Sequence, residues 1–496
     1  MLKQVAGMDN SAQEKAQQNA NAVLSMVQSR FCLIRLSNEI RILDKNEVLE
    51  SQSGKSQRDI NFYKKADGEL LIKRYLETLP HSSDTKKVIN QFWINPNTFM
   101  YDAVAFSPLS LPATTLNYWV GHTANPKAGK WSQIISFLYE VICDHDEEVF
   151  NYLMHYIAHM LQKPEEKPGI MIVMLGAQGT GKGAFFTLMR RIWSKTTLQV
   201  SDVDQVIGRF NASLERNYII LMDEALFAGD KKSIEKLKSL ITESRIGIEQ
   251  KYQPAHSIDS YHRFFAASNN SHFAQIDRDD RRFLFLRVSS EFQGNTEYYK
   301  ALFNAINDDA VINAMVHKLL QTNLSTYNVT SRPKTKEHLK QKIQSLSGFD
   351  RYWYEVLGRG TICGGVLLDE KNPKFSQWPI FIPTHQLVDN YRNNDKNAER
   401  YQTIQTQTIA EKFEKLCPSA TQGRHAKPSH YSKSSVQVRG YHLPTLNIAR
   451  REFEVAIGGN VDWDWSAEEL PTEAAPPDKA CSEGVSAADQ KDLANV

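Results

Sequence analysis

Residues 170–193 read IMIVMLGAQGTGKGAFFTLMRRIW, an apolar run followed by a glycine-rich loop and an amphipathic segment. The loop begins at Gly176 and has the spacing G-x-x-x-x-G-K of a phosphate-binding loop. Between a strand and a helix, consecutive backbone N–H groups of such a loop bind anions. Gly179 and Gly181 allow the backbone to curl around phosphates, and Lys182 can reach the outer two. This context favours a phosphate-binding loop over a glycine-rich turn with a chance lysine.

One position of the loop departs from the usual pattern. Gly183 stands where a Ser or Thr hydroxyl normally holds magnesium. Because magnesium usually keeps several waters, we expect the missing ligand to weaken the metal site without abolishing it. Thr187, one helical turn further on, is expected to point away from the metal. The predicted cofactors are ATP and Mg²⁺, and the predicted cofactor-binding residues are Gly176, Ala177, Gln178, Gly179, Thr180, Gly181, Lys182, Gly183 and Ala184.

The loop lies in a region where strands and helices alternate. From about residue 170 to residue 290, helical stretches separate five short apolar runs, which are IMIVML, TTLQV, YIILM, RFFAAS and FLFLRV. Such alternation is typical of a parallel sheet covered by helices on both faces. The predicted fold class is therefore α/β, with the phosphate loop directly after a strand of this sheet.

Polar side chains follow two of these strands. Asp223 and Glu224 come directly after YIILM, and Asn269 follows RFFAAS. In phosphate-loop sites one carboxylate at this place orients magnesium, and a second polarises the attacking nucleophile. We therefore predict Asp223 and Glu224 as metal ligands. Lys182, Glu224 and Asn269 are the predicted catalytic residues of the site itself, although two acids at the end of an apolar strand are common as a solvated strand end.

Two adjacent arginines, Arg281 and Arg282, precede the last apolar run. A guanidinium is planar, always charged and donates several hydrogen bonds, which suits the charge that develops on a transferred phosphate. Supplied by a neighbouring subunit, such an arginine accelerates phosphoryl transfer roughly a thousandfold or more. The segment alone favours neither this role nor a surface ion-pair cluster with the nearby acids Asp277, Asp279 and Asp280.

Charge is unevenly distributed along the chain. The 496 residues carry a formal net charge of +2. Residues 461–496 hold nine acidic and two basic residues, so the remainder carries +2 + 7 = +9. A basic body is expected of a protein that meets a polyanion, although many basic surfaces only aid solubility. Because no apolar run approaches the roughly 20 residues of a membrane span and no signal peptide is recognised, we expect a cytoplasmic protein without a membrane partner.

Changes in composition divide the chain into six predicted regions. They are a mixed helix and hairpin leader at 1–90, a helical N-terminal collar at 91–165, a phosphate-loop core at 166–290, a helical lid region at 291–348, a winged-helix-like basic domain at 349–465 and a disordered acidic tail at 466–496. The winged-helix prediction rests on the order helix, helix, strand pair. It is accompanied by seven basic and no acidic residues from Lys415 to Arg451.

The order of phosphate loop, Asp-Glu pair, sensor asparagine and arginine pair resembles that of superfamily III helicases, in particular the primase-helicases of phages and mobile elements. The resemblance covers about residues 90–465 and implies an AAA+-like ATPase core. The segment IGIEQKYQPAHSIDSYHRFFAASNN is similar to the hairpin motif and sensor strand of that group. It implies that Lys251 and Tyr252, with His256 as a weaker candidate, grip the nucleic-acid backbone. It also implies that Arg281 or Arg282 is an arginine finger.

The resemblance implies an ATP-driven replicative DNA helicase, a ring-forming homo-oligomer, expected to be a hexamer, that moves on single-stranded or forked DNA in a bacterial host cell. Relatives often carry a primase-polymerase module before the helicase, and 90 residues are too few for one. Priming is therefore not implied, and a separate primase or polymerase is an expected partner. The alternative is a replication initiator or loader that binds DNA and hydrolyses ATP without unwinding. A small-molecule kinase is disfavoured because it has no use for the hairpin motif.

Overall fold

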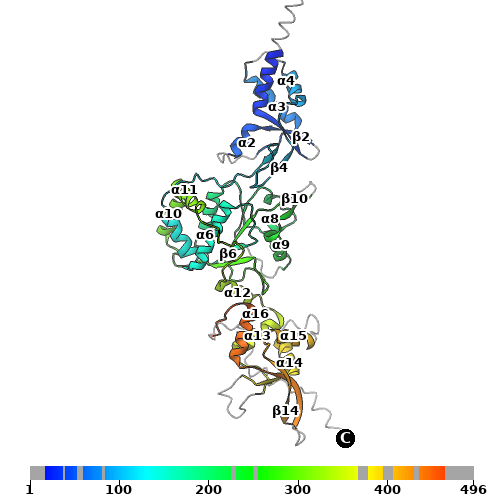
Figure 1. Cartoon of the computed structure of the whole chain (residues 1–496), viewed down its shortest axis with the longest axis vertical. Coiled ribbons are helices and arrows are strands. Elements are labelled where there is room, and N and C mark those ends of the chain that lie inside the picture. Colours follow the sequence, from blue (N-terminus) through cyan, green and yellow to red (C-terminus); the bar gives the residue numbers. More distant parts are fainter. Residues whose placement is uncertain are drawn as a thin grey trace, which may run out of the picture. The chain divides into compact units, whose positions relative to one another are not determined.

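The computed structural model of the chain describes residues 17–36, 39–52, 60–80, 84–224, 231–249, 255–366, 378–394, 406–428 and 435–463. These residues fall into two compact units (Figure 1). Unit 1 comprises the chain up to residue 273 together with residues 281–335. Unit 2 comprises residues 274–280 and the chain from residue 336 onward.

The N-terminal part of unit 1 is built around a three-stranded sheet with the order β2-β1-β3. Strands β1 (Phe31–Leu36) and β2 (Glu39–Asp44) form the antiparallel hairpin that the alternating sequence RFCLIRLSNEIRILD predicts. The inward side chains of this hairpin pack in a small apolar core with the neighbouring helices. The other elements here are a helix at residues 17–30, α2 (Lys45–Gln52), α3 (Lys65–Glu77), α4 (Thr85–Ile94) and β3 (Met100–Tyr101).

The region predicted as a helical collar is helical mainly toward its C-terminal end. Residues 95–131 form irregular backbone and short strands, which include the parallel pair β4 (Ala103–Ala105) and β5 (Thr115–Asn117). Four prolines in this stretch lack the N–H that a helix interior needs, which explains why the aromatic residues there do not lie on a helix. Helices follow as α5 (Ser132–Ser136), the π-helix η1 (Phe137–Ile142) and α6 (Glu147–Gln162).

All five apolar runs predicted as strands form one parallel sheet with the order β12-β6-β11-β8-β7. Every residue of β6, β8 and β11 is buried, as expected for strands covered on both faces. The predicted mixed α/β class with a parallel sheet is thus confirmed. The strands are β6 (Met171–Leu175), β7 (Thr197–Val200), β8 (Ile219–Met222), β11 (Arg263–Ser268) and β12 (Phe283–Arg287).

Helices cover both faces of this sheet. Figure 1 shows α6, α10 (Thr296–Asn307) and α11 (Asp309–Leu320) on one side of β6, and α8 (Asp204–Ile207) and α9 (Lys231–Thr242) on the other. One large apolar core joins α6, α7 (Lys182–Ile192), α10 and α11 to the first of these faces. The remaining elements of unit 1 are the 3₁₀-helix η2 (Ala212–Leu214) and the strands β9 (Arg245–Ile248) and β10 (His256–Asp259).

Unit 2 has its own apolar core, and its antiparallel sheet has the order β13-β15-β14. Helix α14 begins at Thr384. No helix in the described ranges has the length and apolar character that crossing a membrane requires. The elements are α12 (Lys336–Gln344), α13 (Gly348–Arg359), β13 (Phe381–Pro383), α14 (Thr384–Asn394), α15 (Thr406–Leu416), β14 (Thr421–Pro428), β15 (Ser435–His442) and α16 (Leu446–Ile457).

Candidate nucleotide-binding site

The glycine-rich loop joins the buried strand β6 to helix α7, which begins at Lys182. Gly179 and Gly181 have φ angles of 80° and 99°, in the left-handed region that favours glycine. A Cβ atom at Gly181 would lie 3.1 Å from the Phe137 ring and 3.1 Å from the Tyr299 hydroxyl oxygen, so a side chain there would also press on its neighbours. The loop is therefore tightly curled at the N-terminus of a helix, where backbone N–H groups favour an anion.

The side chain of Lys182 lies inside this loop and is only 8% exposed. Its Nζ atom donates hydrogen bonds of 2.6 Å to the carbonyl oxygens of Gly176 and Ala177. Burial lowers the pKa of Lys182, and the nearby carboxylates of Asp223 and Glu224 act in the opposite direction. An anion in the loop would favour the charged form of this lysine, so the site gains electrostatic attraction when a phosphate is present.

The two acids after β8 take different conformations. Asp223 continues the strand, because its backbone N–H donates to the Val200 carbonyl at 2.8 Å, and its carboxylate accepts a bond of 3.2 Å from Gln199. Glu224 has a φ angle of 54°, which a non-glycine residue adopts at an energetic cost. Strain of this kind concentrates at functional sites. The backbone thus continues the strand at Asp223 and turns away from the strand direction at Glu224.

The loop and the acids line one cavity of about 430 Å³, a size usual for small-molecule sites. It lies beyond the carboxyl ends of β6, β8 and β11, where open parallel sheets bind their ligands. The structure therefore brings Lys182, Asp223, Glu224 and Asn269 together, as the sequence predicts. The cavity is lined by Gln178, Gly179, Gly181, Lys182, Gly183, Ala184, Asp223, Glu224, Ala267, Asn269, Tyr299 and Phe303.

Two aromatic residues that line this cavity were not predicted as site residues from the sequence. Tyr299 and Phe303 lie one turn apart on α10 and both line the cavity. The Tyr299 hydroxyl is buried and has no hydrogen-bond partner among the described residues. Burial raises the pKa of Tyr299, so the hydroxyl keeps its proton and can donate to a ligand. The only available signal was the aromatic spacing i, i+4 on a predicted helix, which core packing explains equally well.

The structure also bears on the unusual Gly183. This residue is exposed and lines the cavity, and a Cβ atom added to it would meet no other atom within 4 Å. Thr187 donates its hydroxyl hydrogen to the Gly183 carbonyl at 2.9 Å, so its side chain is engaged within the helix. The expectation that Thr187 does not replace the missing hydroxyl agrees with this contact.

The two arginines lie at the opposite ends of the strands from the cavity. Arg281 and Arg282 precede β12, and the Arg282 carbonyl accepts from the N–H of Met171 at the start of β6. Because β6 and β12 are parallel, these arginines lie at the amino ends of the strands, about 16 Å from the phosphate loop at about 3.3 Å per residue. Within one chain they are not part of the cavity, and their role as a finger stays a prediction.

The predicted hairpin forms from β9 and β10, which pair from Arg245 with Asp259 to Ile248 with His256. Lys251 and Tyr252 lie outside the described residues. The His256 side chain, at the start of β10, lies 3.2 Å from Glu215 through its Nε2 atom. The hairpin is thus present, whereas the nucleic-acid contacts assigned to its tip stay predictions.

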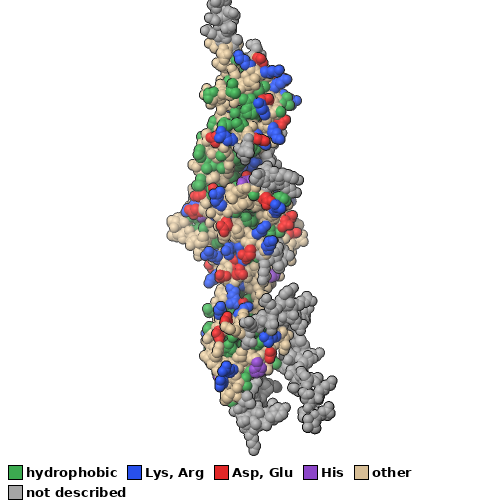
Figure 2. Space-filling model, turned by 90° about the vertical axis from the view of Figure 1, so that its right-hand side faces the viewer, with side chains coloured by type: hydrophobic (Ala, Val, Ile, Leu, Met, Phe, Trp, Pro, Cys, Tyr) green, Lys and Arg blue, Asp and Glu red, His purple; other side chains and the backbone are tan. Residues whose placement is uncertain are grey.

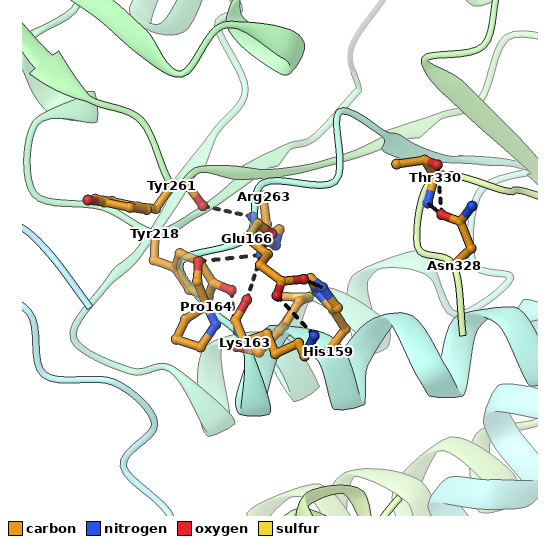
Figure 3. A network of polar contacts seen from close by, with 10 residues as sticks. His159, Lys163, Pro164, Glu166, Tyr218, Tyr261, Arg263, Asn328 and Thr330 are labelled. Carbon is orange, nitrogen blue, oxygen red and sulfur yellow. Dashed lines mark hydrogen bonds and ion pairs between the residues drawn. The ribbon is translucent and has the colours of Figure 1, made fainter. Parts of the chain in front are cut away.

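A buried arginine ties the strand beside β6 to the segment that leads into β6. Arg263, the first residue of β11, is fully buried. Figure 3 shows its guanidinium pointing at the turn after α6, where Nη2 donates to the carbonyl oxygens of Glu166 at 2.6 Å and of Lys163 and Pro164 at 3.4 Å. Nη1 donates to the Tyr261 carbonyl at 3.1 Å. These bonds supply donors to carbonyl groups of the turn that follows α6 and to that of Tyr261.

A second polar chain runs beside Arg263. Lys167 Nζ donates to the carbonyl oxygens of Leu240 and Glu243 at the end of α9 and, at 2.6 Å, to Ser260 Oγ. Ser260 Oγ lies 2.9 Å from His262 Nδ1, and His262 Nε2 lies 2.9 Å from the Leu214 carbonyl. A carbonyl only accepts, so Nε2 carries the proton and Nδ1 accepts from Ser260. The chain is fully paired with a neutral histidine.

Acid is expected to destabilise the protein through this histidine. Burial lowers the pKa of His262 from 6.5 to about 4. Between these two pH values the unfolded chain binds a proton that the folded chain does not, so the free energy of unfolding falls as pH falls through this window. The full effect is about 3 kcal/mol. Urea unfolding at a series of pH values, for the natural protein and for His262→Gln, should show that the natural protein loses about this much more stability. If the free energy of unfolding falls equally with pH in both proteins, the titration of His262 does not cause the loss.

Comparisons with known proteins give matches over different parts of the chain. Residues 174–282 match a family described as a family of unknown function (DUF5906). A DNA primase-polymerase of Nitratiruptor phage NrS-1 is 24% identical over 236 residues, which are 45% of this chain and 32% of that protein. An apo structure of the NrS-1 C-terminal region (305–718) is similar with a TM-score of 0.59 and 14% identity, covering 85% of this chain and 98% of that one. A second apo structure of the same region, its A form, gives a TM-score of 0.58.

These matches correct the predicted activity. The curated relative is described as a DNA primase-polymerase and not as a helicase, so the prediction of an ATP-driven replicative helicase, with ATP hydrolysis coupled to unwinding, is wrong. The matches lend no support to the alternative of an initiator or loader, or to the expected hexamer. The error arose because helicase activity was inferred only from the resemblance in motif order and in the hairpin segment, whereas the loop and the two acids by themselves indicate no particular activity. The chain spans about a third of the relative's length, 32%.

Proposed function

We propose that this chain takes part in DNA replication of the primase-polymerase kind and that unit 1 binds a nucleoside triphosphate with Mg²⁺ at the phosphate loop. The observation that carries the proposal is the convergence of the curled loop, the buried Lys182 and the acids after β8 on one cavity. The likeness to a phage DNA primase-polymerase supports the replication setting, in a bacterial host cell. That this core is of the AAA+ type stays a prediction.

The residues present fit a magnesium nucleotide. Backbone N–H groups at the start of α7 can hold phosphate oxygens, and Lys182 supplies a positive charge among them. Asp223 and Glu224 are oxygen ligands of the kind that magnesium prefers. When bound, the metal would neutralise phosphate charge. Asn269 and the Tyr299 hydroxyl can hydrogen-bond the ligand, and Phe303, which lines the cavity and is 39% exposed, offers an apolar face to a base.

Titration with a fluorescent ATP analogue tests this proposal. The full chain should bind the analogue in the presence of Mg²⁺, and an excess of unlabelled nucleoside triphosphate should displace it. Chelation of the metal by EDTA should weaken binding, because the carboxylates then repel the phosphates. A chain that is folded by circular dichroism and binds no triphosphate with Mg²⁺ would disprove the proposed function.

Replacing Gly183 with serine should lower the Mg²⁺ concentration that gives half-maximal binding of the analogue. The exposed position has room for the side chain, and the added hydroxyl would stand where phosphate loops usually supply a metal ligand. A change of roughly threefold to tenfold is expected, about the effect of one hydrogen bond or ligand. Asp223→Asn is the matched control and should raise the same concentration. An unchanged magnesium requirement in Gly183→Ser would show that another group already fills this position.

A further inference from the structure

The strand pair β14–β15 of unit 2 extends beyond the sheet to which it belongs. The two strands pair antiparallel over eight residues each, from Thr421 with His442 to Pro428 with Ser435. Strand β13 pairs only with residues 440–442 of β15. From Arg439 outward, therefore, β14 and β15 form a two-stranded ribbon with no third strand among the described residues. We call residues 422–426 and 437–441 the ribbon, which thus includes its base in the three-stranded sheet.

Two arginines face each other across the ribbon. Arg424 is directly opposite Arg439, and both side chains are exposed. Side chains at directly opposite positions have Cβ atoms about 5 Å apart, and like charges there destabilise a strand pair. Within the described part of the chain, no hydrogen bond or ion pair engages either guanidinium. The repulsion between them is therefore not offset by an acid among the residues that the structure describes.

The two faces of the ribbon differ in character. On one face His425 and His442 pack against the Phe381 ring, with centroid distances of 5.1 and 5.0 Å. The register places Arg424 and Arg439 on the other face, with the neutral residues Gln422, Ala426, Gln437 and Tyr441.

An acid that contacts the arginine face at its base is already engaged. Glu414 accepts a hydrogen bond of 2.7 Å from Gln422 and lies 3.3 Å from the Tyr441 hydroxyl. It is thus held at the base of the ribbon, where the strands meet α15. At its base this face packs on α15 through Tyr441, which is 2% exposed and whose ring centroid lies 4.8 Å from that of Phe413. Further out the same face presents two positive charges among neutral groups.

We propose that the arginine face of the ribbon binds the phosphate backbone of a nucleic acid. Guanidinium groups match phosphate oxygens with paired hydrogen bonds, and a bound polyanion would convert the repulsion between the two arginines into shared attraction. The residues from Lys415 to Arg451 include seven basic and no acidic ones, so the surrounding sequence also favours a polyanion. On the surface shown in Figure 2, basic and acidic side chains are interspersed around the large sheet, so net charge alone would not single out a binding face there.

The test compares DNA binding by the full chain and by the double variant Arg424→Ala/Arg439→Ala. Binding of a fluorescein-labelled oligodeoxynucleotide, single-stranded and as a duplex, is measured by anisotropy at several salt concentrations. The variant should bind single strands about tenfold more weakly at low salt, and its salt slope should be smaller by about 1.4, the value for two lost phosphate contacts. The conservative variant Arg424→Lys/Arg439→Lys should retain most of the slope. Both variants should bind the ATP analogue like the natural protein, which separates this proposal from the proposed function.

Two controls make the result specific. Arg41→Ala removes a partly exposed arginine of another strand pair, one that is paired with Glu39, and should leave DNA binding unchanged. Polyglutamate serves as an anionic polymer without phosphates and should compete poorly. If Arg41→Ala and the double variant lose the same DNA affinity, the loss reflects net charge and not the ribbon, and the proposal is overturned. Unchanged affinity and slope in the double variant, or a loss of polyglutamate binding without a loss of DNA binding, would also overturn it.

Discussion

Replacing Lys182 with alanine should weaken binding of the ATP analogue by about 100-fold. The Lys182 ammonium lies within the loop and is the one charged donor on the loop side of the cavity lining, opposite the two acids. Charge-assisted hydrogen bonds contribute about 1.5–3 kcal/mol each, and a tenfold change in affinity corresponds to about 1.4 kcal/mol. Loss of contacts to two phosphates therefore accounts for a change of this size. The measurement is the titration described above, in Mg²⁺.

Two further variants separate the loss of the lysine charge from a change in the loop conformation. The alanine variant leaves the carbonyl oxygens of Gly176 and Ala177 without the lysine, which can loosen the loop. Lys182→Gln keeps a donor there but no charge, and should lose nearly as much affinity. Lys195→Ala, after the end of α7, is the matched control and should bind normally. If Lys182→Gln and Lys182→Ala bind triphosphate like the natural protein, the loop does not hold the phosphates.

Replacing Arg263 with alanine should lower the free energy of unfolding by about 3–5 kcal/mol. The change removes donors from four buried or partly buried carbonyl groups and leaves a cavity beneath β11. Arg263 also lies over the Tyr218 ring, with its guanidinium carbon 5.3 Å from the ring centroid, so an aromatic contact is lost as well. Urea unfolding at neutral pH gives the difference directly.

The free energy of unfolding of Arg263→Lys should lie between those of the natural protein and the alanine variant. One ammonium cannot reach all the carbonyl groups that the guanidinium contacts. Arg190→Ala on the exposed face of α7 should change stability by less than about 0.5 kcal/mol. An unfolding midpoint for Arg263→Ala equal to that of the natural protein would mean that water or other groups satisfy the turn after α6 without the arginine.

The strands of the large sheet could be predicted because a strand buried on both faces leaves a continuous apolar run in the sequence. The acids and Asn269 could be placed for a related reason. Parallel strands direct their carboxyl ends to one edge, so residues that follow β6, β8 and β11 meet there whatever their separation in the chain. The site was thus predictable where it depends on strand ends.

Other features depend on contacts that leave no periodic pattern. Tyr299 and Phe303 belong to the site only because α10 packs beside α7, and a helical sequence does not reveal its neighbour. Arg263 begins a strand whose next residues are apolar, yet it is buried because carbonyl groups of the turn after α6 lie beside it. Lys167 lies in the proline-containing segment before β6, and nothing in that segment indicates its partners at the end of α9. In each case a distant segment supplies the partner.

The strand order of the large sheet also has a consequence for synthesis of the chain and for work with fragments. Strand β6 pairs on one side with β11 and on the other with β12, and both are made long after β6 leaves the ribosome. Until residue 287 has been synthesised, the apolar segment MIVML keeps at least one open edge, and open edges of this kind promote aggregation. A fragment limited to residues 174–282 would cut β6 and lack β12 altogether. Soluble expression of the site should therefore require both segments in one polypeptide.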